Sequence, residues 1–289
     1  MGGPVVPGRA RRRRVWFGLV TVLNLARRGF FIPYRYAGRL PGPGARPAYP
    51  AVEARFARAE TRFRDFLERL SRYRTALDAI GRDPPPAPRW AQDWFPRLDA
   101  AVAYALVREE RPRRIVEVGS GHSTRFLARA VADEGHACRI TAIDPAPRAD
   151  LSRLAIELIR AAVPETGERP FQALGAGDFL IIDSSHILMP GSDADYLYGR
   201  VLPALPPGVL VQIHDVFLPD DYPAEWDWRG YNEQLAVLQL ILGAGWELRF
   251  ASHYVATRMA AAVADSAVGR LPLEAGAFES SLWLRKAAS

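Results

Sequence analysis

Two apolar runs in this 289-residue chain, at 179–182 and 209–213, are each followed by an acid and a histidine. The four residues are Asp183, His186, His214 and Asp215. A carboxylate and an imidazole together can move a proton or hold a divalent metal ion. If the two runs are neighbouring strands of a parallel sheet, their carboxyl ends lie at one edge, where such sheets bind ligands. We therefore expect these side chains to share one small volume and to carry the chemistry.

A glycine turn after the run 114–118 supplies a second group of polar residues. The β-branched side chains of this run predict a strand, and glycines at 119 and 121 permit a tight turn that approaches a ligand closely. Ser123 or Thr124 is placed to cap the helix that follows, whose free N–H groups would face a bound molecule. The candidate binding residues of this stretch are Glu117, Gly119, Ser120, Gly121 and Ser123.

The residues after this turn distinguish two kinds of nucleotide site. A dinucleotide site expects a third small residue after the two glycines, where this chain has His122, Ser123 and Thr124. The next expected strand, 139–143, ends in Asp144, about twenty residues after the turn, where doubly wound folds present an acid to ribose hydroxyls. Asp144 is therefore the predicted ribose ligand.

At this point the chain resembles class I S-adenosylmethionine-dependent methyltransferases, whose motifs read E-x-G-x-G after the first strand and an acid after the second. The resemblance covers residues 94–285. It implies an α/β fold with a Rossmann-like, doubly wound, mostly parallel sheet and an antiparallel final strand, here with an N-terminal helical extension. It also implies S-adenosyl-L-methionine as the cofactor, with Glu117 toward its ammonium group, Asp144 on its ribose and Asp183 among its contacts.

The residues after the fourth and fifth strands resemble those of metal-dependent O-methyltransferases of the catechol and macrolide-sugar types. In those enzymes an acid and a pair of residues hold a magnesium ion that binds the substrate hydroxyls. The resemblance implies Asp183, His214 and Asp215 as metal ligands and His186 as the base. His214 stands where those families have a carboxylate, and imidazole suits manganese or iron better than magnesium. The choice among Mg, Mn and Fe stays open, as does the alternative that His214 and Asp215 merely start a loop.

Composition limits the cellular context and the partners. With 49% apolar residues, the chain can form one large α/β domain and an extension. The single cysteine, Cys138, excludes an internal disulfide and suits a reducing compartment, so we expect a cytoplasmic protein. The net charge of +6 rests on arginine, since Lys286 is the only lysine, and no RNA-binding motif accompanies it. We therefore expect no nucleic-acid partner.

Residues 1–50 form a basic and apolar segment that ends in a linker rich in Gly and Pro. Arginines at 11–14 precede the apolar run 15–26, which a further arginine pair closes. Twelve residues are too few to span a bilayer, and no small-x-small cleavage site follows. One interpretation is a helix that lies on the inner membrane face through residues 11–32. The other is a helix docked on the catalytic domain or on a dimer mate.

Residues 51–88 predict one long helix, and residues 89–289 the S-adenosylmethionine-binding domain. Apolar residues from Val52 to Ile80 recur at alternating intervals of four and three, so this stripe must be buried. A coiled-coil homodimer and packing within the same chain would both bury the stripe, and we favour packing within the chain. Aromatic residues at 90, 94 and 95 then precede a helix at 98–108, and they would line the site or pack in the core.

Shorter patterns predict the remaining elements. They are a helix from about Ala149, a strand at 155–159, a helix at 233–242, and two final strands at 246–250 and 281–284, with His253 and Tyr254 ending the first of these two. The loop 217–228, with aromatic residues at 222, 226 and 228, is long for the carboxyl end of a strand. Such a loop is typical of a substrate lid, with a plain packing loop as the alternative.

The sequence as a whole favours S-adenosylmethionine-dependent methyl transfer to a hydroxyl of a small molecule or glycan, with His186 and Asp183 as the catalytic residues. A NAD-dependent oxidoreductase is the rival enzyme, but the chain lacks a Tyr-x-x-x-Lys pair. A non-catalytic, membrane-associated binding protein that retains the fold is the rival from another class. Polar residues at four strand ends argue against that second rival, because a scaffold has no need of them.

Overall fold

The computed structural model describes residues 8–288. Its contacts divide the chain into two compact units, one formed by residues 49–219 and 232–289 and the other by residues 1–48 and 220–231. The larger unit contains the sheet and all the predicted site residues.

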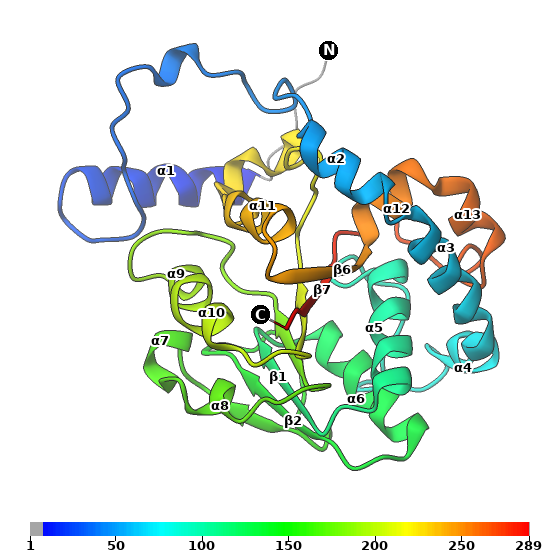
Figure 1. Ribbon diagram of the computed structural model, residues 1–289. Coiled ribbons are helices and arrows are strands. Elements are labelled where there is room, and N and C mark those ends of the chain that lie inside the picture. Colours follow the sequence, from blue (N-terminus) through cyan, green and yellow to red (C-terminus); the bar gives the residue numbers. More distant parts are fainter. Residues whose placement is uncertain (1–7, 289) are drawn as a thin grey trace. The chain divides into compact units, whose positions relative to one another are not determined.

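The larger unit is built on one seven-stranded sheet with the order β3-β2-β1-β4-β5-β7-β6 (Figure 1). Its strands are β1 Arg114–Val118, β2 Arg139–Ile143, β3 Glu157–Ile159, β4 Phe179–Ile182, β5 Leu210–Ile213, β6 Trp246–Ala251 and β7 Leu282–Lys286. The first five strands pair in parallel, and β7 runs antiparallel to both β5 and β6. The predicted fold class, a Rossmann-like, mostly parallel sheet with an antiparallel final strand, is confirmed.

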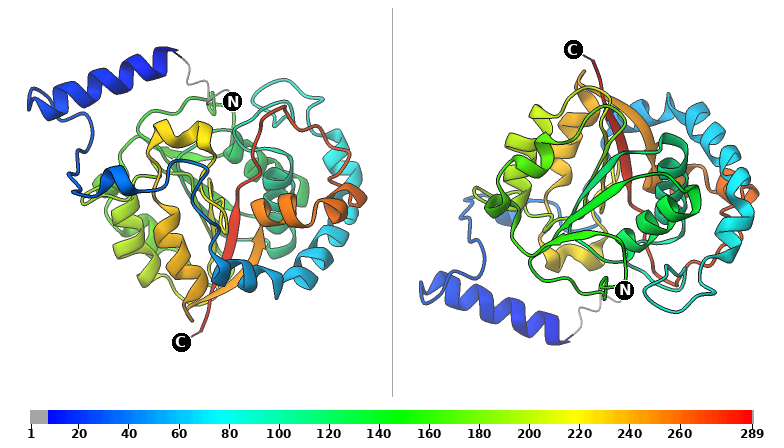
Figure 2. Two further views of the ribbon diagram at one scale, coloured as in Figure 1. Left: turned by 90° about the horizontal axis from the view of Figure 1, so that it is seen from above. Right: turned by 90° about the horizontal axis from the view of Figure 1, so that it is seen from below.

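Helices cover both faces of this sheet. They are α2 Pro50–Ala57, α3 Glu60–Arg69, η2 Leu70–Tyr73, α4 Arg74–Ala79, α5 Arg97–Glu110, α6 His122–Glu134, α7 Val163–Thr166, α8 Arg169–Gln172, α9 Asp193–Tyr196, η3 Leu197–Val201, α10 Leu202–Ala204, α11 Gln234–Leu242, α12 Ser252–Arg258 and α13 Ala260–Asp265. Figures 1 and 2 show α5 and α6 on one face and α9 to α11 on the other. Every residue of β4 and β5 is buried between them, as parallel strands require.

The stretch 51–88, predicted as one long helix, is instead divided into α2, α3, the turn η2 and α4. Its apolar stripe is buried against the same chain. Phe56 packs on Tyr254 and Phe66 packs on Phe250, in both cases with ring centroids 5.4 Å apart. The breaks let the stripe follow the surface of the domain, which one straight helix could not do. The prediction of packing within the chain is confirmed, and the prediction of a single helix is wrong.

The helix predicted from about Ala149 is also absent from the described residues. Residues 145–156 form turns and bends, and β3 starts only after them, at Glu157. The carboxylate of Asp150 accepts hydrogen bonds from the N–H and the hydroxyl of Ser152 at 3.0 and 2.7 Å. An aspartate that bonds two residues ahead favours a turn over a helix.

His253 and Tyr254, predicted to end a strand, lie in α12 instead. The pairing of β6 with β7 ends at Ala251, and the N–H of Ser252 makes a last bond of 2.8 Å to the carbonyl of Ser281. Beyond that point the chain has no strand partner and continues as a helix. This helix places the Tyr254 ring on α2 and α3.

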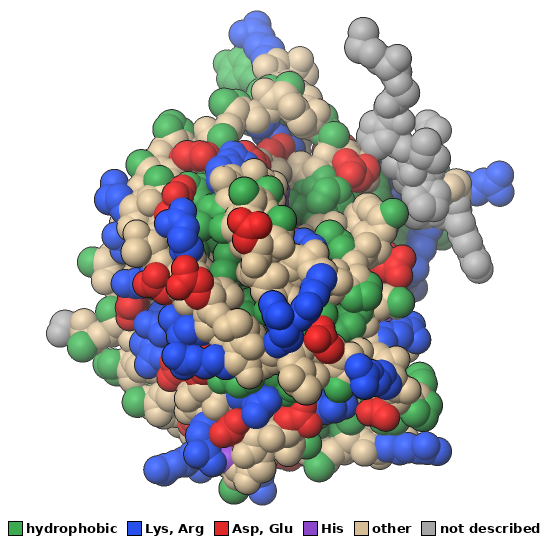
Figure 3. Space-filling view, turned by 90° about the vertical axis from the view of Figure 1, so that its right-hand side faces the viewer, with side chains coloured by type: hydrophobic (Ala, Val, Ile, Leu, Met, Phe, Trp, Pro, Cys, Tyr) green, Lys and Arg blue, Asp and Glu red, His purple; other side chains and the backbone are tan. Residues whose placement is uncertain are grey.

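Basic and acidic side chains lie side by side on the face of the protein that Figure 3 shows. On α3, Arg62 and Arg64 are exposed, and so are Asp65 and Glu68. Charges of both signs on one exposed helix face are typical of a solvated face.

The smaller unit contains α1 Gly8–Val22, the turn η1 Ala37–Arg39 and the turn η4 Ala224–Arg229. Arg46 forms an ion pair of 2.6 Å with Asp221 within it. The expected lid, 217–228, is therefore shared between the units, because its residues 220–228 belong to the smaller one. Across residues 8–288, no helix is both long and apolar enough to cross a membrane.

Candidate active site

Gly119 lies where β1, β2 and β4 end together. Its N–H donates to the carbonyl of Ile143, and the N–H of Asp183 donates to the carbonyl of Val118, both at 2.9 Å. Gly119 has a φ of +83°, and a Cβ at this position would lie 2.2 Å from the carbonyl oxygen of Asp183. The turn therefore requires glycine, because no side chain fits there.

Glu117 is fully buried beneath this turn. The hydroxyls of Ser123 and Thr124 each donate to its carboxylate at 2.6 Å, and Thr124 Oγ1 accepts the Gly121 N–H at 2.9 Å. Burial raises the pKa of Glu117 to about 7, against the lowering effect of the two hydroxyls. In this structure Glu117 holds the first turn of α6 to β1. Its contact with an ammonium group stays a prediction.

Asp144 ends β2 beside the same turn. Ser120 Oγ donates to its Oδ2 at 2.7 Å, and the N–H of Ala146 donates to its Oδ1 at 2.8 Å. The residue is only half-buried, so its carboxylate remains accessible to a ligand. The structure thus brings the predicted ribose ligand next to the glycine turn, and its role stays a prediction.

A cleft of about 360 Å³ opens along this edge of the larger unit. Four of the predicted binding residues line it, namely Ser120, Gly121, Ser123 and Asp183. Trp94 and Phe95 line it as well, whereas Trp90 is buried and donates to the carbonyl of Leu77 at 3.1 Å. A volume of this size is typical of small-molecule and cofactor sites.

Three arginines that sequence reasoning did not single out also line this cleft. They are Arg89, Arg125 and Arg148. The guanidinium of Arg148 lies 4.9 Å from the ring centroid of Trp94. Burial, together with the charges of Arg125 and Arg89, lowers the pKa of His122 to about 4. This end of the cleft is therefore basic and suits an anionic group such as a carboxylate.

The four residues after β4 and β5 do lie in one cluster. His186 Nε2 is 3.2 Å from Asp183 Oδ1 and 3.4 Å from Asp215 Oδ2. His214 Nδ1 is 3.6 Å from Asp183 Oδ1 and 3.4 Å from Asp215 Oδ1. Both histidines and Asp215 are buried, whereas the Asp183 side chain is 37% exposed. The expected meeting of two carboxylates and two imidazoles is what the structure shows, and their roles stay predictions.

Two further carboxylates complete this cluster from distant parts of the chain. Glu233 Oε2 lies 2.8 Å from His186 Nδ1, and Asp99 Oδ2 lies 3.5 Å from His214 Nε2. Asp99 also accepts the N–H groups of Ser280 and Ser281 at 2.9 Å. Neither acid belongs to a local motif, so the sequence offered no signal for them.

These contacts set the charge of the cluster. Burial opposes a charged His186, but Asp183, Asp215 and Glu233 outweigh it and raise its pKa well above the ordinary value. Burial is likewise outweighed at His214, whose pKa is raised by Asp215 and Asp183. The two histidines in turn hold the pKa of Asp183 well below its usual range, against burial. The surroundings therefore favour the charged forms of Asp183 and of both histidines.

The backbone is strained at two members of this cluster. His186 has a φ of +59° and Asp215 a φ of +56°, values that side-chain-bearing residues adopt rarely. The carbonyl of His186 accepts the N–H groups of Asn232 and Glu233 at 3.1 and 3.3 Å, which holds the strained loop in place. Strain of this kind concentrates at functional sites.

The donor atoms of the cluster fit a divalent metal ion. Asp183, His186 and Asp215 each offer one atom, and the three atoms lie within 4.8 Å of one another. A mixed carboxylate and imidazole set suits manganese, iron or zinc. Compared with the predicted set, His186 takes the place of His214 in this grouping.

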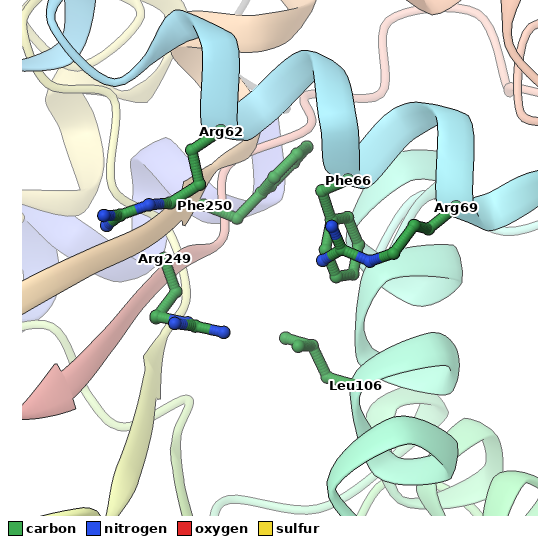
Figure 4. A pocket seen from close by; sticks show the side chains of 6 residues that line it. All are labelled: Arg62, Phe66, Arg69, Leu106, Arg249 and Phe250. Atoms are coloured by element: carbon green, nitrogen blue, oxygen red, sulfur yellow. The ribbon is translucent and has the colours of Figure 1, made fainter.

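A second, smaller hollow lies between α3, α5 and β6, as Figure 4 shows. Arg62, Arg69 and Arg249 line it together with apolar side chains. Each arginine forms an ion pair with a glutamate, and the shortest N···O distances are 3.1, 3.3 and 3.3 Å respectively. This hollow is therefore a structural ion-pair network that lies apart from the proposed chemistry.

A family model matches part of the chain. Residues 116–216 match the family described as "Methyltransferase domain". No match was found among curated proteins.

Several solved structures resemble the chain at low identity. The SAH-bound methyltransferase PaMTH1 of Podospora anserina is 14% identical, with a TM-score of 0.44, over 90% of this chain and 100% of its own. An O-methyltransferase from Bacillus cereus in complex with SAH is 13% identical, with a TM-score of 0.42, over 77% and 90%. Likeness at this level carries no argument about activity.

The family match begins within β1 and includes the glycine turn and all of β2, β3, β4 and β5, and thus every strand end that forms the cleft and the cluster. The part of the sheet from within β1 to the end of β5 is therefore similar to a methyltransferase domain.

Proposed function

We propose that this protein transfers a methyl group from S-adenosyl-L-methionine to a hydroxyl of a small molecule or sugar, with His186 as the base. The observation that carries the proposal is the position of Asp183. This residue lines the cleft and also lies 3.2 Å from His186. The cofactor cleft and the histidine cluster therefore adjoin at one residue.

The residues around the cleft fit this cofactor. Asp144, held by Ser120, would accept the ribose hydroxyls, and the arginines at 89 and 125 would face the carboxylate of the methionine part. When bound, S-adenosylmethionine supplies a methyl group already activated on a sulfonium. The protein then has to hold the acceptor oxygen in line with that group, because correct orientation by itself accelerates the transfer strongly.

His186 is oriented to remove the proton from the acceptor. The contact of Nδ1 with Glu233 fixes the ring and directs Nε2 toward Asp183 and Asp215. The raised pKa of His186 favours the imidazolium, so the ring must first release the proton on Nε2 and keep the one on Nδ1 toward Glu233. As the oxygen–methyl bond then forms and the sulfur–methyl bond breaks, the hydroxyl proton passes to Nε2 and the sulfur leaves as the thioether of S-adenosylhomocysteine. The carboxylate of Glu233 stabilises the resulting imidazolium, as in other histidine and carboxylate pairs.

A divalent metal is the alternative occupant of this cluster, favoured by the grouping of Asp183, His186 and Asp215. A bound metal would lower the pKa of the acceptor hydroxyl. Nε2 of His186 would then be a ligand and could not accept the proton. The two roles of His186 therefore exclude each other and can be separated by experiment.

The test measures formation of S-adenosylhomocysteine with catechol and with methyl glycosides as acceptor probes. We expect His186→Ala to lower the rate by about 10²- to 10⁴-fold, the usual share of a general base, with cofactor affinity unchanged. His136→Ala is the control, because its ring bonds to the carbonyl of Pro112 at 3.2 Å, outside the cluster. Activity of His186→Ala within a few-fold of the unchanged protein would contradict the base role.

Two further measurements test the base role and the cofactor separately. Turnover that survives metal stripping with a chelator supports His186 as the base, whereas turnover that is lost and then restored by Mn²⁺ or Mg²⁺ contradicts it. Calorimetric titration with S-adenosylmethionine, with NADH as the control, tests the cofactor independently. We expect Asp144→Ala to abolish saturable binding of S-adenosylmethionine, and preferential binding of NADH would overturn the methyltransferase proposal.

A further inference from the structure

The charge of this chain is concentrated at one end. Residues 1–48 contain ten arginines and no acidic residue, although the net charge of the whole chain is only +6. The remaining residues therefore carry a net charge of −4. The basic character noted in the composition belongs to this segment and not to the methyltransferase domain.

The exposed apolar side chains are concentrated in the same segment. Twelve of the sixteen exposed large apolar residues found in residues 8–288 lie between positions 15 and 40. Trp16 is 62% exposed, Leu25 73% and Phe31 67%. Isolated exposed apolar residues are ordinary, but a continuous series of them marks an interaction surface.

Basic and apolar residues alternate in blocks along this segment. Exposed arginines at 12–14 are followed by apolar residues from Val15 to Val22, and a second basic pair, 27–28, is followed by Phe30 to Ile32. The guanidinium of Arg13 lies 5.0 Å from the ring centroid of Phe17. Arginines and aromatic rings that lie together in this way are typical of helices at a membrane interface.

The geometry excludes a membrane-spanning role for α1. Its apolar part, Val15 to Val22, is about 12 Å long at 1.5 Å per residue, whereas a hydrocarbon core is about 30 Å thick. The helix then ends, because Asn24 adopts a φ of +56° and the N–H groups of Leu25 and Ala26 both turn back to the carbonyl of Val20. A helix this short can lie in an interface but cannot cross it.

We propose that residues 8–48 dock this protein onto a lipid bilayer that carries anionic headgroups. The arginines bind the headgroup phosphates, and the side chains of Trp16, Leu19 and their neighbours enter the boundary between headgroups and acyl chains. Charge complementarity selects this occupant, since ten arginines without one acid oppose docking of a second copy of the same segment. The proposal is independent of the reaction at the cleft.

The test is cosedimentation of the full-length protein with vesicles of phosphatidylcholine, alone or mixed with phosphatidylglycerol. We expect binding to the mixed vesicles only, and weaker binding at high salt. Replacing Arg12, Arg13 and Arg14 by Gln should lower the affinity by about 100-fold, from roughly 1 kcal/mol for each arginine. Replacing Arg58, Arg64 and Arg72, which are exposed in the larger unit, is the matched control and should change little.

Two results would overturn the proposal. Equal binding to both kinds of vesicle would show that the arginines do not recognise the negative charge of the headgroups. Absence of vesicle binding, with self-association that Trp16→Ala and Leu19→Ala abolish, would show that a second copy covers the apolar residues. Saturable binding of S-adenosylmethionine by each variant verifies that the methyltransferase domain is still folded.

Discussion

Glu117 and Asp183 are acids near the ends of the neighbouring strands β1 and β4, yet their environments push their pKa values in opposite directions. Burial raises the pKa of Glu117 to about 7, although two hydroxyl groups donate to it. At Asp183 burial acts in the same sense, but two imidazole rings outweigh it and lower the pKa. A pair of acids whose environments separate their pKa values marks a division of roles. We call the surroundings of Glu117 the neutral half of this sheet edge, because burial favours the protonated acid there, and the surroundings of Asp183 the charged half.

Gly119→Ala would disturb both halves at once, and we expect the largest loss of stability from it. The new Cβ would meet the carbonyl oxygen of Asp183 at 2.2 Å, so β1 or β4 must move, at a cost of at least about 3 kcal/mol. Urea denaturation measures the free energy of unfolding. Gly135→Ala is the matched control, because Gly135 has a similar φ of +67° but no atom near the added Cβ. A similar loss in both variants would show that φ, and not the contact with Asp183, requires glycine.

Glu117→Gln tests the neutral half. The folded-state pKa of about 7 lies above the ordinary value of 4.5. A raised folded-state pKa gives stability that is complete below the unfolded value and is lost as the pH rises through the folded one. We therefore expect the unchanged protein to lose about 3 kcal/mol relative to Glu117→Gln between pH 4.5 and pH 8, since one pKa unit is about 1.4 kcal/mol.

Denaturation of both proteins at pH 4.5 and pH 8 measures this difference. Glu274→Gln, at an exposed position, is the control and should show no such change with pH. The free energies of unfolding of Glu117→Gln and the unchanged protein could instead differ by the same amount at both pH values. In that case ionisation of Glu117 would cost little free energy, and the contrast with Asp183 would disappear.

Asp183→Asn tests the charged half, and its expected effect on stability is the smallest. Asp183 has a depressed pKa, so its contribution to stability is complete above the unfolded pKa of about 4. The histidines have raised pKa values, so their contribution is complete below the unfolded pKa of about 6.5. Both contributions are therefore complete between these two values. In the metal-free protein at pH 5.5 we expect a loss of about 1 kcal/mol, a low figure because the Asp183 side chain is 37% exposed. Proton NMR titration should also show a lower pKa for His186 and His214, and unchanged values would refute their coupling to Asp183.

The sequence predicted the parts of the site that depend on local chain geometry. The glycine turn, the acid after β2 and the four residues after β4 and β5 each follow directly from a strand end, so their meeting required only a parallel sheet. Glu233 lies 47 residues from its partner His186 and opens an ordinary helix. Contacts of that kind depend on how α11 packs, which no local pattern encodes.

The same limit explains the stretch 51–88. Heptad spacing predicted correctly that its apolar stripe is buried, because burial follows from periodicity. The breaks between α2, α3 and α4 are determined by the partners of the stripe, Phe250 and Tyr254, which come nearly 200 residues later in the chain. Periodicity shows which face of the segment is buried, but not where the helix must break to follow the surface on which it packs.

The anchoring of Asn232 has a consequence for which part of the chain can change in length. Its side chain accepts the N–H of Leu188 at 2.7 Å and donates to the carbonyl of the same residue at 3.2 Å. On the other side of residues 220–231, the carbonyl of Pro219 accepts the N–H of Tyr49 at 2.8 Å. Both ends of residues 220–231 are thus fixed to the larger unit. We therefore expect a change in the length of this stretch to leave Asp215 and Glu233 in place, so that sequence variation is tolerated there better than in the cluster.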